Sequence, residues 1–215
     1  MELFFSPLAC SMAARIAFAE ASAEVKLIEV DPRTKRVLAT GETYLAIHPL
    51  GLVPALRTDD GAVLTENASI LQFIADEFPA ARLAPSESDR IGRAKLRQWL
   101  SFVGTELHKG LMIPLLGRDT PPEVKAWVLS KYASRVAYLD ESLAGREFLL
   151  DRFSVADAYL FTVLNWTQAT PEIDLAVYPN VKAYLERMRQ RPGVADSLAL
   201  EVPLFRAEIA RRKAA

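Results

Sequence analysis

The sequence predicts two domains of different class: an α/β domain with a mixed four-stranded sheet, followed by an all-α helical bundle. Two observations support this. Short apolar runs alternate with helix-like segments up to about residue 80, and from residue 89 onward no strand pattern recurs. The chain has 215 residues, which is enough for two small domains that each bury a core.

The first domain, residues 1–80, is predicted from the order of its elements. The expected elements are a buried strand at 2–5, an Ala-rich helix at 11–20, a strand at 25–30, a weakly helical polar stretch at 33–46, short strands at 54–56 and 62–64, and a helix at 68–77. The first three form a β-α-β unit, whose crossover implies parallel strands. The last two strands flank Thr58-Asp59-Asp60-Gly61, a turn signal typical of a hairpin. This order indicates a compact α/β layer fold.

The second domain, residues 89–215, follows a linker at 81–88 that contains Pro85. One apolar stripe at helical spacing is formed by Leu96, Leu100, Val103, Leu107 and Leu111. Further helices are expected at about 121–144, 154–168 and 180–190, and Ser154-Val155-Ala156-Asp157 predicts a capping box that starts one of them. The basic cluster at 206–213 is interpreted as a solvated tail.

Composition excludes several classes of protein. A formal net charge of -1 and the lack of a basic stripe argue against a nucleic-acid partner, and 51% hydrophobic residues argue against disorder. The apolar N-terminus lacks the basic region of a secretory signal, and no stretch is long enough to span a bilayer, so we expect no membrane partner and a cytoplasmic location. One cysteine and two histidines predict neither a disulfide within the chain nor a metal site.

Cys10 is the strongest candidate for chemistry. It follows a strand and a Ser-Pro turn and lies at the start of a helix, where free N–H groups and a partial positive charge favour a thiolate and a lower thiol pKa. A lone cysteine is more often an inert packing residue. The first loop of a β-α-β unit, however, is where thiol redox folds keep their reactive sulfur. A resolving cysteine would fall at position 13, which is Ala13, so a redox role needs an external thiol.

Three further groups are weaker candidates. Glu66-Asn67 opens a helix, where it is either a simple cap or a recognition site for a ligand that carries a carboxylate and an ammonium group. Val53-Pro54 starts a strand, and its peptide bond is cis or trans. Ser101, Thr105, His108 and Met112 share one helix face beside the apolar stripe, which suits a cleft lining or an ordinary exposed face. Tyr159 and Trp166 are more typical of a core than of ligand contacts.

Together these segments resemble the glutathione transferase family, and most of all its bacterial beta class. The resemblance covers nearly the whole chain. The matching stretches are LFFSPLACS at 3–11, HPLGLVPAL at 48–56, LTENASI at 64–70, TELHKG at 105–110 and FSVAD at 153–157. It implies a thioredoxin-like N-terminal domain, an all-helical C-terminal domain and a homodimer. Glutathione, as co-substrate, would lie on the first domain and the electrophile in a cleft between the domains.

The resemblance also implies roles for individual residues. Those implied in catalysis are Cys10, Ser11 and His108. Those implied in glutathione binding are Lys35, Leu52, Val53, Pro54, Glu66, Asn67, Ser101 and Lys109. In the family the Val53 backbone would pair with the cysteinyl part of glutathione, Pro54 would be cis, and Glu66 and Asn67 would hold the γ-glutamyl group. The chain departs from the family pattern at Asn67, where Ser is usual, at Leu52, where beta-class members have Gln, and at Ser101, where Asn is frequent.

The function implied by the resemblance is conjugation of glutathione to small hydrophobic electrophiles, with disulfide reduction or thiol transfer through Cys10 as a variant. Ser6 and Ser11 are alternative thiolate-stabilising hydroxyls, whereas activation by a tyrosine is disfavoured because the first tyrosine is Tyr44. A different class of function stays open, since fold alone does not imply catalysis. The chain would then be a non-catalytic binding or regulatory module, or a store for bulky apolar ligands.

Overall fold

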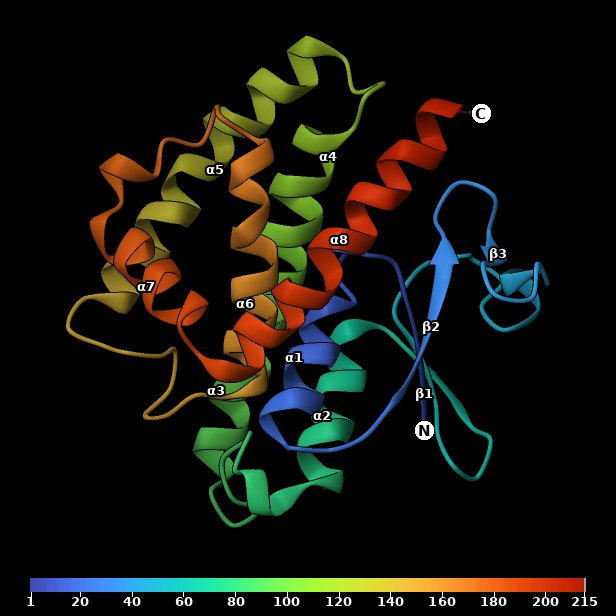
Figure 1. Cartoon of the computed structure of the whole chain (residues 1–215). Coiled ribbons are helices and arrows are strands. Elements are labelled where there is room, and N and C mark those ends of the chain that lie inside the picture. The colour runs from blue at the N-terminus through green and yellow to red at the C-terminus, as the bar shows by residue number, and fades with distance from the viewer. Residues whose placement is uncertain (215) are drawn as a thin grey trace. The chain divides into compact units, whose positions relative to one another are not determined.

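The computed structural model describes residues 1–214 and divides into two compact units (Figure 1). The first unit contains Met1–Leu83 together with the chain from Arg191 onward, and the second contains Ala84–Gln190. The sequence placed all of 89–215 in one helical domain. The difference lies in the C-terminal helix, which packs within the first unit.

The sheet of the first unit has five strands in the order β3-β2-β1-β4-β5. They are β1 (Glu2–Phe5), β2 (Lys26–Asp31), β3 (Arg36–Val37), β4 (Ala55–Arg57) and β5 (Val63–Thr65). Strands β1 and β2 are parallel and the other pairs antiparallel, so the mixed sheet is confirmed. The predicted number of four was wrong. The extra strand, β3, lies in the stretch expected to be helical, and with two residues it shows no periodicity that a sequence pattern could reveal.

The core of this unit explains why β3 forms. Val37 is buried against Phe4, Val30, Tyr44 and Ala55 in one apolar cluster, whereas its neighbour Arg36 is exposed. Side chains alternate between the faces of a strand, so one buried residue is enough to fix which face of β3 turns inward. The turn η1 (Tyr44–Ala46) completes the stretch that was expected to be weakly helical.

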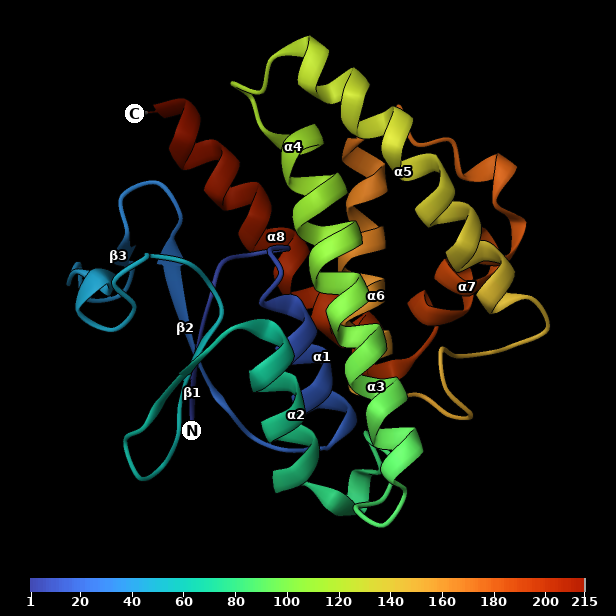
Figure 2. The same cartoon turned by 180° about the vertical axis from the view of Figure 1, so that it is seen from behind.

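Three longer helices belong to the first unit: α1 (Met12–Glu20), α2 (Asn67–Glu77) and α8 (Pro192–Ala214). Helix α1 lies side by side with α2 and also packs against α8, as both views show (Figures 1 and 2). The basic cluster at 206–213, predicted to be a solvated tail, is helical and continues α8. Most of their charged side chains are exposed, but Glu208 is buried and Arg211 forms an ion pair with Glu29 of β2.

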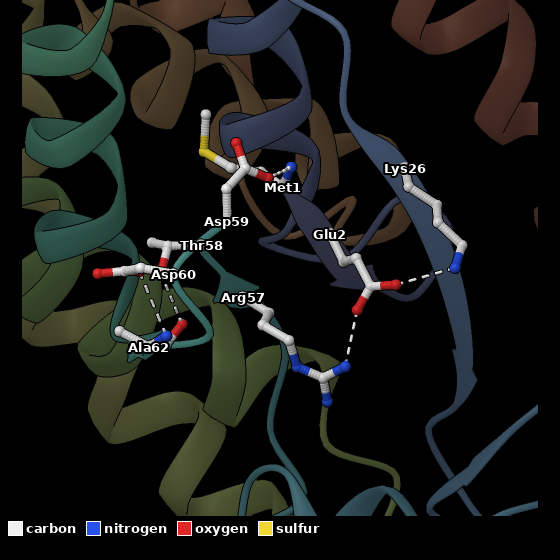
Figure 3. Close-up of polar contacts among 8 residues, drawn as sticks. All are labelled: Met1, Glu2, Lys26, Arg57, Thr58, Asp59, Asp60 and Ala62. Carbon is white, nitrogen blue, oxygen red and sulfur yellow. Dashed lines mark hydrogen bonds and ion pairs between the residues drawn. The ribbon is translucent and has the colours of Figure 1, made fainter.

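Ion pairs join neighbouring strands at the N-terminal end of β1 (Figure 3). The Glu2 carboxylate of β1 accepts hydrogen bonds from Lys26 of β2 at 2.9 Å and from Arg57 of β4 at 2.7 Å. The Lys26 hydrogen bond lowers the pKa of Glu2 despite some burial. In the predicted hairpin turn, the Thr58 hydroxyl donates to the carboxylate of Asp60 and to the carbonyl of Ala62. These contacts tie three neighbouring strands together at the end of β1 away from Cys10.

The second unit is all-helical where it is described, as predicted. Its elements are α3 (Arg90–Phe102), the π-helix η3 (Val103–Met112), α4 (Ile113–Leu116), α5 (Pro122–Leu143), α6 (Val155–Asn165), η4 (Trp166–Ala169), η5 (Leu175–Val177) and α7 (Pro179–Arg189); the turn η2 (Pro79–Ala81) lies at the end of the first unit. The predicted apolar stripe on α3 and η3 is buried throughout. Within residues 1–214, no helix combines the length and apolar character needed to cross a membrane.

The π-helix changes the polar strip expected on this helix. Ser101 and Thr105 are exposed, but His108 and Met112 are buried, so the four residues do not form one solvent-facing strip. A π-helix has more residues per turn than an α-helix, and side chains after its start are rotated relative to α-helical expectation. The alternative of an ordinary exposed face is therefore wrong for His108 and Met112.

Candidate functional site

The loop that contains Cys10 joins β1 to α1 and is closed by two serines. The Ser6 hydroxyl donates to the carbonyl of Val30 at 2.6 Å, which anchors the loop to β2. The Ser11 hydroxyl donates to the Ser6 carbonyl at 3.2 Å and accepts from the Ser6 amide at 3.3 Å. Ser11 is fully buried. Both hydroxyls therefore hold the loop in shape, and Cys10 is the partly exposed member of the group.

The Cys10 sulfur is partly exposed and does not lie in the core. Its thiol donates to the carbonyl of Val53, with 3.0 Å between Sγ and the oxygen. The sequence analysis expected free N–H groups at the start of α1. Instead, the amides of Met12 and Ala13 donate to the carbonyls of Ala9 and Cys10. The positive end of the α1 dipole still faces this loop.

The segment before β4 lies beside the sulfur. The Val53–Pro54 peptide bond is cis. The Tyr44 hydroxyl donates to the carbonyl of Leu52 at 2.8 Å, and burial raises the pKa of this phenol. Tyr44 is thus a neutral, fully buried support for this segment. The Leu52 side chain is solvent-exposed.

The side chain of Lys35 packs against Gly51, which belongs to the same segment. At Gly51 (φ +61°), a Cβ would lie 2.9 Å from Cδ of Lys35, so the lysine stem passes directly over this position. The positive φ and the close approach both require glycine there. Lys35 itself has φ +57°, and its carbonyl accepts from the Tyr44 amide at 2.8 Å. The Lys35 side chain therefore lies beside Gly51, the residue before Leu52.

Glu66 and Asn67 lie at the N-terminus of α2. Glu66 has φ +66° and ψ 120°, an uncommon conformation for a residue other than glycine, and its side chain is exposed and does not cap the helix. Asn67 is only 6% exposed, and its Nδ2 donates to the carbonyl of Cys10 at 2.8 Å. Its Oδ1 is buried without a hydrogen-bond partner. The simple cap is therefore not what this pair forms, and Asn67 couples α2 to the cysteine loop.

The second unit contains three of the predicted site residues, His108, Ser101 and Lys109. Of these, His108 is buried. The His108 ring is 3% exposed, with Nδ1 2.7 Å from the hydroxyl of Tyr159 and its centroid 5.1 Å from that of Trp166. Burial, and then the charge of Lys109, lower the pKa of His108 to about 4. The imidazole is thus neutral at physiological pH, and Tyr159, expected to be only a core residue, orients it.

The other two predicted site residues of the second unit, Ser101 and Lys109, are exposed. Ser101 ends a turn of α3, where its carbonyl accepts from the Thr105 hydroxyl at 3.0 Å, and Lys109 extends from the π-helix. No group of three or more potential metal-binding side chains is found among residues 1–214.

The sequence analysis did not identify Glu201, which contacts the loop that contains Cys10. Its carboxylate, supplied by α8, accepts from the Leu8 amide at 2.7 Å. One signal was available, since Glu201 is a single charge between the apolar runs Leu198-Ala199-Leu200 and Val202-Pro203-Leu204. A charge in such a position is typically either solvent-facing on a helix or buried with a partner.

Comparisons with known proteins place both parts of the chain in one family. Residues 9–77 match the glutathione S-transferase N-terminal domain and residues 106–192 the glutathione S-transferase C-terminal domain. The chain is 42% identical to glutathione S-transferase GstA of Escherichia coli O157:H7 over 203 residues, which covers 94% of this chain and 98% of that protein.

Two solved structures are similar over the same extent. One is a sphingomonad glutathione S-transferase complexed with glutathione (TM-score 0.88, 42% identity), and the other is a bacterial beta class glutathione S-transferase of Sphingomonas chungbukensis (TM-score 0.87, 41% identity). Each likeness covers 94% of this chain and 98% of the other. The chain therefore belongs to the glutathione S-transferase family, close to its bacterial beta class.

Proposed function

We propose that the chain is a glutathione S-transferase that joins the sulfur of glutathione to small hydrophobic electrophiles, with Cys10 beside the reacting sulfur. One observation supports this most directly. The Cys10 thiol, the Val53 carbonyl and the Asn67 amide converge at the N-terminal ends of α1 and α2. An extended peptide that carries a thiol finds there a backbone to pair with, as an added strand does, and a sulfur-handling side chain.

The parts of glutathione suit the residues around this point. The exposed Glu66 carboxylate offers an acceptor for the γ-glutamyl ammonium group, and the unpartnered Oδ1 of Asn67 offers a second. The strained conformation of Glu66 is a reason to assign it a function rather than a structural role. Lys35, held over Gly51, offers a cation for the glycyl carboxylate.

Two reactions fit the site. In conjugation, the glutathione thiolate attacks an electrophilic carbon, a C–S bond forms, and the leaving group departs with its electron pair. In thiol transfer, the Cys10 thiolate attacks one sulfur of oxidised glutathione, forms a mixed disulfide and releases the other half as thiolate. Because Ser11 is committed to closing the loop, we assign the contact with sulfur to Cys10 and a supporting role to Ser11.

We further propose that His108, Ser101 and Lys109 bind glutathione from the helical unit, with His108 as a neutral hydrogen-bonding group. The family resemblance and the exposed apolar side chains of Leu45 and Leu50 support a homodimer. A single thiol without a disulfide partner suits the reducing cytoplasm. Light scattering checks the dimer, which a monomer at micromolar concentration would contradict.

The proposal is tested with the wild-type chain and the Cys10→Ala variant. We expect the wild type to be retained on immobilised glutathione, to be released by free glutathione and to conjugate chlorodinitrobenzene. Mass spectrometry with oxidised glutathione should show one glutathione adduct, on Cys10, that the variant lacks. Cys10→Ala should weaken disulfide chemistry more than conjugation. A chain that shows neither retention nor turnover would instead be a binding module of this fold.

A further inference from the structure

The chain makes a tight turn from Asp31, the last residue of β2, to Lys35. In this Asp31 turn, the Oδ1 of Asp31 accepts hydrogen bonds from the amide of Arg33 at 2.8 Å and from the amide of Thr34 at 3.0 Å. The carbonyl of Asp31 accepts from the amide of Lys35 at 3.0 Å. Pro32 suits the start of the turn, because its ring fixes φ and it has no amide that needs an acceptor. The Asp31 carboxylate therefore holds this turn as an N-cap residue holds the first turn of a helix.

The Asp31 turn ends in a strained residue, Lys35. It has φ +57°, in the left-handed region that residues other than glycine rarely adopt. Such a conformation persists only where neighbouring contacts hold it. The Lys35 amide donates to Asp31, its carbonyl accepts from the Tyr44 amide at 2.8 Å, and the stem of its side chain passes over Gly51. Contacts on both sides of Lys35 therefore set the direction in which its side chain leaves the backbone.

Asp31 is ionised at neutral pH. Burial raises the pKa of its carboxyl, but the amides of Thr34 and Arg33 lower the pKa, as do the charges of Arg33 and of Arg211 on α8, and the net shift is downward. A charged acceptor forms stronger hydrogen bonds with backbone amides than a neutral acceptor does. Removal of this carboxylate therefore loosens the Asp31 turn more than removal of a neutral acceptor would.

We propose that Asp31 is a positioning residue for recognition of the glycine end of glutathione: through the Asp31 turn it holds Lys35 where the lysine ammonium group meets the glycyl carboxylate. The inference rests on the proposed function, in which Lys35 is the cation for that carboxylate. Asp31 has the same sign of charge as the glycyl carboxylate, so a direct contact between them is repulsive and Asp31 acts through the backbone. Loss of Asp31 should therefore weaken only ligands that possess the glycyl carboxylate.

Two ligands separate this role from general support of the fold. The first is S-methylglutathione, and the second is its glycinamide analogue, in which the glycyl carboxylate is replaced by a neutral amide. Neither has a free thiol, so Cys10 forms no disulfide with either. Calorimetry gives the Kd of each ligand, and the wild type should prefer S-methylglutathione about fivefold or more, the effect of one charge-assisted hydrogen bond.

Four variants are compared with the wild type. Asp31→Ala removes the acceptor, whereas Asp31→Asn keeps an acceptor oxygen for the two amides. Lys35→Ala removes the cation. Asp174→Ala is the matched control, because the Asp174 carboxylate also holds a single turn by accepting from an amide two residues later, that of Ala176 at 2.8 Å, but in the second unit.

The first measurement is the preference of each variant between the two ligands. In Asp31→Ala the preference for S-methylglutathione should fall below about twofold, because this ligand binds more weakly while the glycinamide analogue keeps its affinity. Asp31→Asn should restore most of the preference, Lys35→Ala should abolish it, and Asp174→Ala should leave it as in the wild type. The proposal is overturned if Asp31→Ala keeps the wild-type preference, or if Asp174→Ala loses it.

The second measurement needs only the wild type. Coupling between two groups is reciprocal, so a ligand that fixes Lys35 must also stabilise the turn that positions it. At saturation, S-methylglutathione should slow hydrogen exchange of the Arg33 and Thr34 amides, followed by NMR, at least about threefold more than the glycinamide analogue does. Equal exchange with the two ligands overturns the proposal, and this measurement decides if Asp31→Ala does not fold.

Failure of the proposed function gives a different result. If the wild type binds neither ligand, the proposed function is wrong and the role of Asp31 is wrong with it. If the wild type binds both ligands with equal affinity, glutathione binding stands, whereas the contact of Lys35 with the glycyl carboxylate and the role of Asp31 are both refuted.

Discussion

The clearest test of the helical unit is the Asp157→Ala substitution at the start of α6. The Asp157 carboxylate is fully buried and accepts hydrogen bonds from the amides of Leu149 and Ser154, each at 2.9 Å, and from the hydroxyls of Ser154 and Tyr184. The interactions with Ser154 form the predicted capping box. Alanine leaves two buried amides without an acceptor.

The expected cost follows from those two amides. Each buried donor that loses its partner costs ~1–3 kcal/mol, so the free energy of unfolding should fall by about 4 kcal/mol. The hydroxyls of Ser154 and Tyr184 can rotate and add little. A loss of this size is a large fraction of the ~5–15 kcal/mol that stabilises a typical protein.

Urea denaturation followed by circular dichroism measures this loss, with Asp89→Ala as the control. Asp89 caps α3 by accepting from the Gly92 amide at 2.8 Å, but it is exposed, so water replaces the lost acceptor and the cost should be about 1 kcal/mol. If Asp157→Ala loses less than about 1 kcal/mol, or no more than Asp89→Ala, the reasoning from buried hydrogen bonds is refuted.

Three further predictions concern individual side chains. Because the pKa of His108 is lowered from 6.5 to about 4, the folded state binds a proton at this ring less readily than the unfolded state does. His108 should therefore contribute no pH dependence to the stability above pH 6.5, and the free energy of unfolding should fall by at most ~3 kcal/mol as the pH drops towards 4. NMR titration of the ring checks this. Asn67→Ala should weaken glutathione binding at least about fivefold in calorimetry, because it removes the amide that ties α2 to the Cys10 carbonyl, whereas equal affinity would refute that role. Gly110→Ala should destabilise the chain by ~1–3 kcal/mol, since the new Cβ would lie 1.6 Å from the Tyr132 hydroxyl; a Tyr132→Phe background should recover part of the loss in thermal unfolding.

Local signals predicted much of the fold and of the site. Strand β1 and the start of α1 were expected within one residue, because the apolar run and the Ser-Pro turn lie next to each other in sequence. The same locality singled out Cys10 and Glu66-Asn67, each of which follows a strand and opens a helix.

What the sequence did not reveal depends on contacts between distant segments. Strand β3 is too short for a pattern and exists because Val37 fits the apolar cluster of the sheet. The π-helix η3 rotates His108 into the interior, and regular helical spacing cannot predict that rotation. Glu201 contacts a loop 193 residues away, so its role becomes visible only once α8 has its place in the first unit.

The central claim is that the Cys10 sulfur lies where glutathione binds, and protection from alkylation tests it most directly. S-methylglutathione occupies a glutathione site but cannot form a disulfide. At saturation it should slow the alkylation of Cys10 by iodoacetamide at least ~tenfold, with a midpoint equal to its Kd from calorimetry. If the ligand binds and Cys10 is alkylated at an unchanged rate, the sulfur is not part of the glutathione site.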